Sequence, residues 1–234
     1  MSAPWFFTER VNLGAVHLSA AEAQHAGAAK RLNAGDAVTL FDGRGVIGVG
    51  EISALGKRDA VVEIARLETA PPPRPLTIAT AIPKGKRWQI LVEKLTEIGA
   101  TKIVPLKFAR SVVTGIEITA AARWSIEAGK QARRAWLPVI ETETTLAKFL
   151  ATAKDADLFL ADPQGEKLTG GDAAAREVRK KAERVGLIGP EGGLTPEEVA
   201  ACVAAGAQLL QLGDYILRVE TAAIVAAIML IHYY

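Results

Sequence analysis

The sequence predicts an α/β protein with a small, mostly β N-terminal part and a larger part built on a mostly parallel sheet. Three observations carry this prediction. Short apolar runs separated by turn signals fill residues 37–64. A stiff proline-rich connector follows at residues 70–75 and marks a domain boundary. Beyond it, strand-like apolar runs alternate with helical segments, which is typical of a parallel sheet with helices on both faces.

The N-terminal part contains three expected strands, at residues 37–41, 46–52 and 60–64, and one helix near residues 19–31. Asp42-Gly43 between the first two strands is a typical hairpin turn. A Gly-x-Gly-x-x-Gly spacing also occurs at residues 43–48. We reject it as a dinucleotide-binding motif, because a strand rather than a helix follows it.

Five strands and four helices are expected beyond the connector. The strands are at residues 76–82, 102–106, 157–161, 185–188 and 208–212, and the helices are at 88–98, 120–136, from 196 onwards, and from about 220 to 231. The last helix is almost wholly apolar but too short to span a bilayer. We expect it to form a dimer interface or, alternatively, to be buried within one subunit.

The first of two candidate binding loops follows the strand at residues 185–188. It reads Gly189-Pro190-Glu191-Gly192-Gly193. Glycines let a ligand approach the backbone closely. The next residues resemble a helix start, with Thr195 as N-cap and Glu198 closing a capping box. Because the acidic residues would repel phosphate and no P-loop lysine is present, we expect a ligand that is neutral or cationic on this side.

The second candidate loop lies at residues 212–221, again between a strand and a helix. Its charged residues before the helix are Asp214, Arg218 and Glu220. Two strand-to-helix junctions so close in sequence place both loops at the carboxyl edge of one sheet, where open α/β folds bind ligands. The alternative interpretation is that both are only tight turns that pack two helices.

The charge distribution indicates a polyanionic partner. The chain has a formal net charge of +2, but residues 74–134 hold twelve Lys and Arg against four Glu. Lys84, Lys86 and Arg87 even open a helix, where the macrodipole disfavours cations. An external anion such as a phosphate backbone would offset that preference. A solvated basic face without a partner is the alternative.

The remaining composition bounds the compartment and the chemistry. Hydrophobic residues make up 50% and charged residues 23%, which is typical of a soluble globular protein. A single cysteine, Cys202, excludes an internal disulfide, and no basic-plus-apolar leader opens the chain, so we expect a cytoplasmic protein. The histidines are scattered and no cluster has metal-ligand spacing, so we expect no metal.

The two loops together resemble the signature of the ribosomal RNA small subunit methyltransferase E family, in the SPOUT class of RNA methyltransferases. The matching strings are Gly-Pro-Glu-Gly-Gly and Leu-Gly-x-x-Ile-Leu-Arg-x-Glu-Thr-Ala. The resemblance implies a PUA-like, RNA-binding β-barrel over residues 1–70 and a SPOUT domain with a trefoil knot over residues 71–234. It further implies S-adenosylmethionine as cofactor, N3 of a uridine in 16S ribosomal RNA of the small ribosomal subunit as target, and a homodimer.

Site residues follow from this resemblance and from the chemistry. The implied cofactor-binding residues are Leu160, Gly189, Pro190, Glu191, Gly192, Gly193, Leu212, Gly213, Ile216, Leu217 and Arg218. The candidate RNA-binding residues are His25, Arg31, Lys84, Lys86, Arg87, Arg110 and Arg134, with an exposed helix position as the alternative for His25. We expect Arg218 to stabilise negative charge on the target base. Glu191 or Glu220 would accept a proton or orient the cofactor, or would only cap a helix.

Three positions depart from the family pattern. Trp5, Tyr215 and Val219 stand where the family commonly has Arg, Arg and Thr. We expect retained cofactor binding and altered RNA affinity. Two other functions stay open: a SPOUT enzyme acting on transfer RNA or ribose 2′-hydroxyls, and a non-enzymatic RNA-binding assembly factor.

Overall fold

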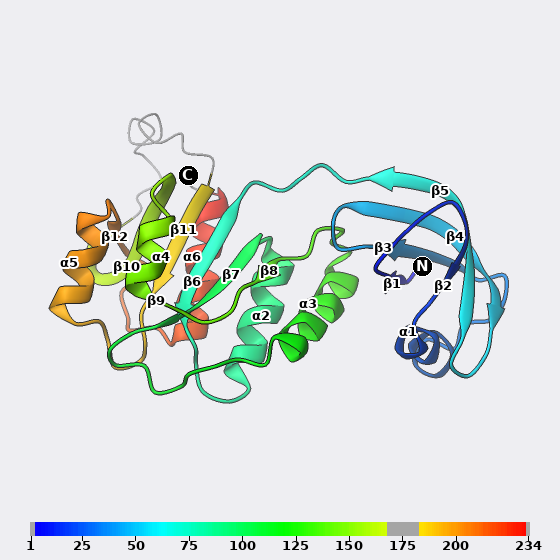
Figure 1. The fold of residues 1–234 in the computed structure, drawn as a ribbon, viewed down its shortest axis with the longest axis horizontal. Coiled ribbons are helices and arrows are strands. Elements are labelled where there is room, and N and C mark those ends of the chain that lie inside the picture. Colours follow the sequence, from blue (N-terminus) through cyan, green and yellow to red (C-terminus); the bar gives the residue numbers. More distant parts are fainter. Residues whose placement is uncertain (1–2, 168–182, 233–234) are drawn as a thin grey trace. The chain divides into compact units, whose positions relative to one another are not determined.

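The computed structural model describes residues 3–167 and 183–232 and contains two compact units (Figure 1). The first unit comprises residues 1–72 and 126–137, and the second comprises residues 73–125 and 138–234. The division after residue 72 falls in the proline-rich connector. Assignment of residues 126–137 to the first unit was not predicted, because no local pattern indicates it.

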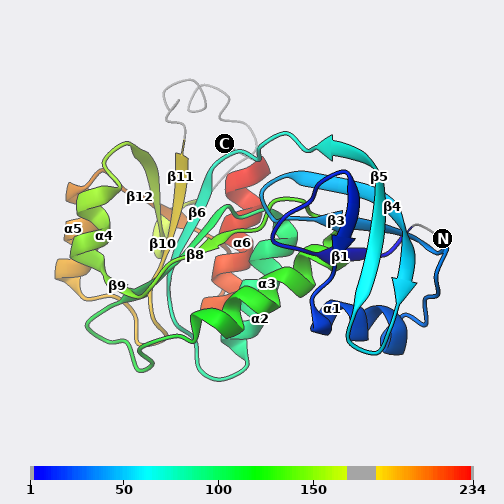
Figure 2. The same cartoon turned by 45° about the vertical axis from the view of Figure 1, so that its right-hand side comes forward.

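The first unit is built on a five-stranded sheet in the order β1-β3-β4-β5-β2 (Figure 2). Its strands are β1 (Trp5–Phe7), β2 (Gly14–His17), β3 (Ala37–Phe41), β4 (Val46–Leu55) and β5 (Ala60–Thr69). Helix α1 (Ala20–Gln24) continues into a π-helical turn, η1 (His25–Ala29). The three predicted strands are confirmed, whereas β1 and β2 are too short for a periodic pattern to indicate them. Alternating inward side chains, including Phe6, Leu40 and Val62, form a separate core.

The second unit contains a sheet in the order β12-β10-β11-β6-β7-β8, and every pairing in it is parallel. Its strands are β6 (Leu76–Ala81), β7 (Lys102–Lys107), β8 (Val139–Ile140), β9 (Thr144–Thr145), β10 (Ala156–Lys167), β11 (Glu183–Ile188) and β12 (Gln208–Gln211), with β9 paired to β7. The parallel α/β prediction is therefore confirmed. Central strands such as β6 are buried at every residue, which explains their continuous apolar character.

The helices of the described second unit cover this sheet. They are α2 (Arg87–Ile98), the first half of α3 (Ile118–Ala132), α4 (Leu146–Thr152), α5 (Pro196–Ala204) and α6 (Val219–His232). Helix α6 packs on β6, β11 and α2, while α4 contacts α5. Right-handed crossovers place α2 and α6 on one face and α4 and α5 on the other (Figures 1 and 2). In the described part of the chain, no helix is both long and apolar enough to cross a membrane.

Two elements differ from the predicted bounds. Helix α3 ends at Ala132 rather than near residue 136, because Arg133 has a left-handed backbone with φ of 53°. Strand β10 extends to Lys167 rather than ending at Ala161, because its pairing with β12 resumes after a bulge. Ala161 and Glu166 both pair with Leu210 of β12. The trefoil knot stays a prediction.

The single thiol is expected to be inert in the folded protein. Cys202 is fully buried in α5, and burial, aided by the nearby Glu198 carboxylate, raises the pKa of its thiol to about 11. At about pH 8 the reactive thiolate is therefore scarce. A chromogenic disulfide reagent should label the denatured chain rapidly and the native chain hardly at all. Fast labelling of native protein would contradict the burial of this thiol.

Candidate active site

The sheet of the second unit brings both candidate loops to one edge. Strands β11 and β12 end at Ile188 and Gln211, and β6 and β7 run in the same direction. Because all are parallel, the segments after them, residues 189–195, 212–218, 82–86 and 108–117, lie at the carboxyl edge. This edge is the lower one in Figure 1. The prediction that the two loops share an edge is confirmed.

The first loop ends in the predicted capping box. Thr195 Oγ1 accepts a hydrogen bond from Glu198 N at 3.2 Å, and Glu198 Oε2 accepts one from Thr195 N at 2.9 Å. The other carboxylate oxygen, Glu198 Oε1, accepts from Ala109 N at 2.7 Å and so joins the segment after β7 to α5. Since Glu198 caps α5, Glu191 is not the cap of this helix in the described part of the chain.

Glycines in the two loops serve different purposes. A Cβ on Gly189 would lie 2.9 Å from Leu194 Cγ, so the loop's own packing excludes a side chain at this position. A Cβ on Gly213 would have no heavy atom within 4 Å. Open space at Gly213 leaves its backbone accessible to a ligand, as expected for a loop that binds through main-chain groups.

Arg110 holds the first loop. Its Nη1 donates to the carbonyl oxygen of Gly192 at 3.1 Å and lies 3.5 Å from that of Leu194. We expected an RNA contact from this residue. The structure gives it a hydrogen-bonding role between residues 108–117 and the glycine loop, and the residue as a whole is exposed.

Arg87 lies between the two candidate catalytic carboxylates. Its Nη1 donates to Glu191 Oε1 at 2.8 Å, and its Nε lies 3.9 Å from Glu220 Oε1. Glu220 is in the first turn of α6, with a side chain that is only 10% exposed. Its other oxygen, Oε2, is buried without a hydrogen-bond partner among the described residues. For Arg87, an anion that offsets the helix dipole is therefore present within the protein itself, and its assignment as an RNA contact stays a prediction.

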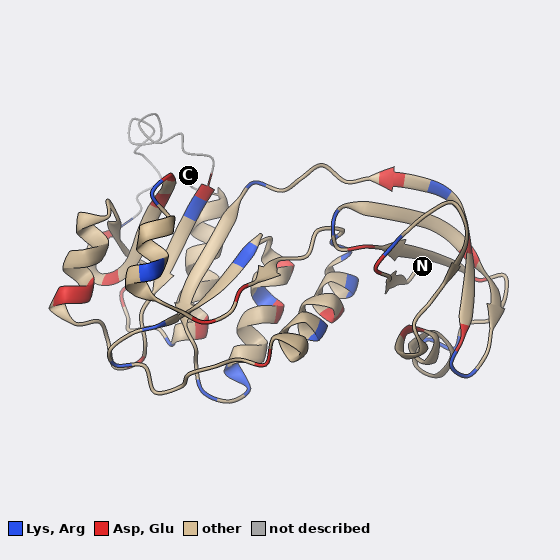
Figure 3. Cartoon of the chain, viewed as in Figure 1, with Lys and Arg blue, Asp and Glu red and all other residues tan. Residues whose placement is uncertain are grey.

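Lys84 and Lys86 differ from Arg87, because both are exposed and neither pairs with a carboxylate in the described part of the chain. Figure 3 shows the loop before α2 in blue and the start of α5 in red, so charges of both signs lie at separate places along this edge. These two lysines keep the properties expected of phosphate contacts.

The second loop is the more exposed of the two. Tyr215 and Ile216 have 85% and 94% of their surface exposed, although both are large and apolar. Asp214 accepts a hydrogen bond from Lys167 Nζ at 2.6 Å, which lowers the pKa of this carboxyl. Arg218 is exposed, and its carbonyl accepts from Ala222 N at 2.8 Å to begin α6. Leu212 and Leu217 are half-buried beneath the loop.

Leu160 lies in the core rather than in a loop. It is fully buried in β10, where it pairs with Leu187 of β11 and Leu209 of β12, and its role in cofactor binding stays a prediction. The bulge after it, residues 162–165, was missed, although Pro163 and Gly165 directly after a strand are turn signals. Asp162 Oδ1 accepts from Gln164 N at 2.7 Å within this bulge.

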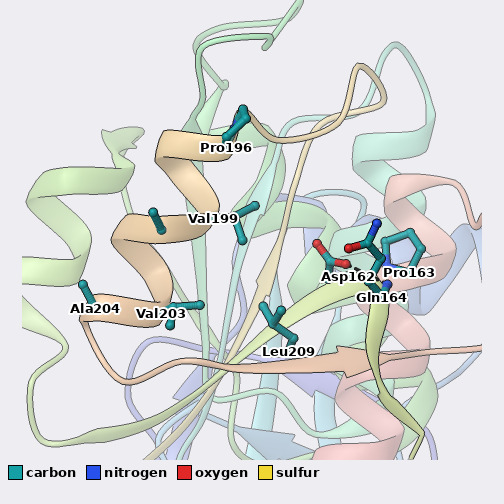
Figure 4. A pocket seen from close by; sticks show the side chains of 9 residues that line it. Asp162, Pro163, Gln164, Pro196, Val199, Val203, Ala204 and Leu209 are labelled. Atoms are coloured by element: carbon teal, nitrogen blue, oxygen red, sulfur yellow. Dashed lines mark hydrogen bonds between the residues drawn. The ribbon is translucent and has the colours of Figure 1, made fainter.

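A hollow of about 700 Å³ opens between α5 and this bulge (Figure 4). It is lined by Asp162, Pro163, Gln164, Pro196, Val199, Ala200, Val203, Ala204 and Leu209. None of the predicted cofactor-binding residues is among them. The hollow therefore neighbours the loops without including them.

The other predicted RNA-binding residues belong to the first unit. Arg31 is exposed, with a left-handed φ of 56°. The ring of His25 packs edge-on against Phe6 at 6.1 Å, and burial lowers its pKa, helped by Lys130. Burial also lowers the pKa of Arg134 to about 10. Of these three residues, Arg31 is the exposed one.

Lys130 does not contribute to a basic surface. Its ammonium lies 2.9 Å from both Glu22 and Glu127, and the Lys130 and Glu22 side chains are buried. The positive charge of Lys130 is therefore balanced within the first unit, and its ion pair with Glu22 connects the end of α3 to α1. Among the described residues, no group of three or more His, Cys or acidic side chains is arranged to hold a metal ion.

The parallel sheet, with its two ligand loops at one edge, and the separate β-rich unit define the class of the protein. The family model for an RNA methyltransferase domain matches residues 70–231, and that for an RNA methyltransferase PUA domain matches residues 18–65. The protein is thus an RNA methyltransferase by family. More particularly, the chain belongs to the ribosomal RNA small subunit methyltransferase E family.

Two relatives with that name show the extent of the similarity. The protein from Synechocystis sp. is 30% identical over 224 residues, which cover 93% of this chain and 73% of the relative. The one from Mycobacterium bovis is 30% identical over 218 residues, covering 88% and 81%.

Solved structures agree over almost the whole chain. Ribosomal RNA small subunit methyltransferase E from Neisseria gonorrhoeae, bound to S-adenosyl methionine, is 26% identical with a TM-score of 0.83, and the match covers 98% of each chain. A Legionella pneumophila protein solved with the cofactor SAM is 28% identical with a TM-score of 0.84, covering 97% of this chain and 96% of that one.

Proposed function

We propose that this protein transfers a methyl group from S-adenosylmethionine to N3 of a uridine in 16S ribosomal RNA of the small ribosomal subunit. The observation that carries the proposal is the meeting of the two family loops at one sheet edge, with exposed Arg218 and the carboxylates of Glu191 and Glu220 there. Family membership supports the RNA class and the cofactor. Because its substrate would be the small ribosomal subunit, we propose that the protein acts in the cytoplasm.

The residues present fit this cofactor. Glu191 and Glu220 share a single cation, Arg87, so these three side chains together keep a net negative charge that suits a ligand carrying positive charge. Gly213 leaves backbone groups open to such a ligand. When bound, S-adenosylmethionine supplies an activated methyl group on a cationic sulfur. Residues 189–193 and 212–218 would hold it, with Leu160 supporting them from the core.

The protein's own side chains would stabilise the charge on the uridine base and accept the proton from its N3. N3 of uridine is an imide nitrogen, so it loses its proton as the new bond forms. Arg218 would stabilise the negative charge that develops on the base, since a guanidinium stays protonated. Glu191 or Glu220 would accept the proton. Lys84, Lys86 and Arg31 would bind phosphates, with His25 and Arg134 contributing from the first unit.

The proposal is tested by methyl transfer from labelled S-adenosylmethionine to small ribosomal subunits purified from cells that lack this gene. Nuclease digestion and mass spectrometry should reveal 3-methyluridine at one site. Label in transfer RNA or on ribose instead would refute the substrate assignment. Absence of cofactor binding in a calorimetric titration would favour a non-enzymatic role.

We also propose that two copies of the chain pair through α6. The outward side of this helix carries few polar groups, and its exposed or half-buried residues are Thr221, Ile224, Val225, Ile228, Met229, Ile231 and His232. An apolar stripe of this kind is typical of a face covered by a partner. A second copy of the chain, which the resemblance described above leads us to expect, is the occupant proposed here.

Ile228→Glu should therefore produce a monomer. Ile228 is 40% exposed in the single chain, so the charge is tolerated there but not inside an apolar interface. Light scattering should show a dimer for the native protein and a monomer for this variant. The matched control, Val139→Glu, changes an exposed valine of β8 away from α6 and should remain dimeric. A monomeric native protein would contradict the proposal.

A further inference from the structure

Arg87 connects three elements of the candidate site. Its guanidinium leaves the first turn of α2, donates to Glu191 in the glycine loop and lies against Glu220 in the first turn of α6. It is half-buried, whereas the neighbouring Lys84 and Lys86 are exposed. A cation shared by two carboxylates is poorly placed to bind a phosphate, because the bound carboxylates would repel that phosphate.

We infer that Arg87 is a positioning residue for the cofactor loop and not an RNA contact. The glycine loop is exposed at Glu191, Gly192 and Gly193, so few apolar contacts hold this stretch in place. Two guanidinium contacts do so instead: Arg110 on the carbonyl of Gly192 and Arg87 on the side chain of Glu191. Arg87 thereby fixes the loop to the starts of α2 and α6.

The environment of Glu220 favours an arginine rather than a lysine at position 87. Its carboxylate is buried and one oxygen lacks a partner among the described residues, so the nearby cation is the main compensation for its charge. The other charged group in contact with Arg87 is Glu191. Glu220 also lies two positions after Arg218 in the sequence. A lysine would provide charge but not two separately directed contacts.

The inference rests on the proposed function and is tested by cofactor binding. Isothermal titration with S-adenosylmethionine should show a Kd about tenfold to a hundredfold weaker for Arg87→Met, because the loop must be ordered at the moment of binding. Arg87→Lys should recover part of the loss. Glu191→Gln weakens the same Arg87–Glu191 contact from the glycine loop. If the two residues act through this one contact, the double variant Arg87→Met with Glu191→Gln should bind the cofactor no more weakly than the weaker-binding single variant. Lys94→Met, which removes an exposed cation from α2, is the matched control and should bind normally.

Salt dependence of RNA binding separates positioning from RNA contact. Each phosphate contact contributes about 0.9 to the slope of log affinity against log salt for a duplex and about 0.7 for a single strand. The slope should be unchanged in Arg87→Met and reduced in Lys84→Met with Lys86→Met. A reduced slope together with a normal cofactor Kd in Arg87→Met would overturn the inference. Native protein that binds no cofactor at all would instead refute the proposed function.

Discussion

Arg218→Ala should lower the single-turnover rate of methyl transfer by about 10²- to 10³-fold, the usual loss when a charge-stabilising group is removed. The side chain is exposed at the carboxyl edge, and it would act on the base as N3 loses its proton. Arg218 contributes to the fold through its backbone, because its carbonyl oxygen accepts a hydrogen bond from Ala222 N. That bond survives the substitution, so the fold should stay close to native, and any change in the cofactor Kd is measured separately by titration. Rapid-quench transfer to small subunits measures the rate.

Arg218→Lys is the informative companion variant. It keeps the positive charge but loses the planar guanidinium, so an intermediate rate would indicate that charge and geometry both contribute. Arg123→Ala removes an exposed arginine from α3 and should not change the rate. Native turnover in Arg218→Ala would exclude Arg218 from catalysis.

Gly165→Ala should lower the free energy of unfolding of the second unit by about 1–3 kcal/mol or more, as overpacked sites do. A Cβ at Gly165 would lie 2.5 Å from Leu210 N and 2.6 Å from the carbonyl carbon of Leu209. Both atoms are backbone, so no side-chain rotation relieves the overlap. Strand β12 must move, and the loop that follows it moves too. Urea unfolding followed by hydrogen exchange in β10 and β12 would measure the loss.

Gly213→Ala is the matched control for Gly165→Ala. It adds the same methyl group in open space just after β12, the strand that Gly165 of β10 packs against, so stability should be unchanged. Its cofactor Kd should nevertheless rise if the ligand approaches this backbone as proposed. Equal stability of Gly165→Ala and Gly213→Ala would show that the bulge is not held by close backbone contact.

Features encoded locally could be predicted from the sequence. The capping box at Thr195 involves residues three positions apart, and the buried strands follow from short apolar runs. Long-range contacts could not be predicted. Arg87 and Glu191 are 104 positions apart, and Arg110 and Gly192 are 82 apart. Arg87 was interpreted as an RNA contact from its own neighbourhood, and Arg110 from its match to a family position, so neither long-range contact entered the prediction.

The β10 bulge shows a second reason for incomplete prediction. Its extent depends on how residues 162–167 pair with β12, which the apolar pattern of β10 alone does not specify. Leu160 was assigned to the site by resemblance, yet its neighbours Leu187 and Leu209 enclose it on both sides. The cofactor role of Leu160 therefore stays a prediction, and its burial means that it would act from within the sheet.

The pairing of β6 with β11 has a consequence for how the chain is synthesised. Thr77 Oγ1 donates to Glu183 Oε1 although 106 positions separate these residues. At a ribosomal elongation rate of about 5–20 residues per second, β6 waits on the order of ten seconds before its partner strand has been made. Every residue of β6 is buried in the finished sheet. β7, which covers the other edge of β6, follows only about 25 residues later in the chain. During that interval the β11-facing edge of β6 is unpaired, so we expect association with other nascent chains to be a risk at this edge.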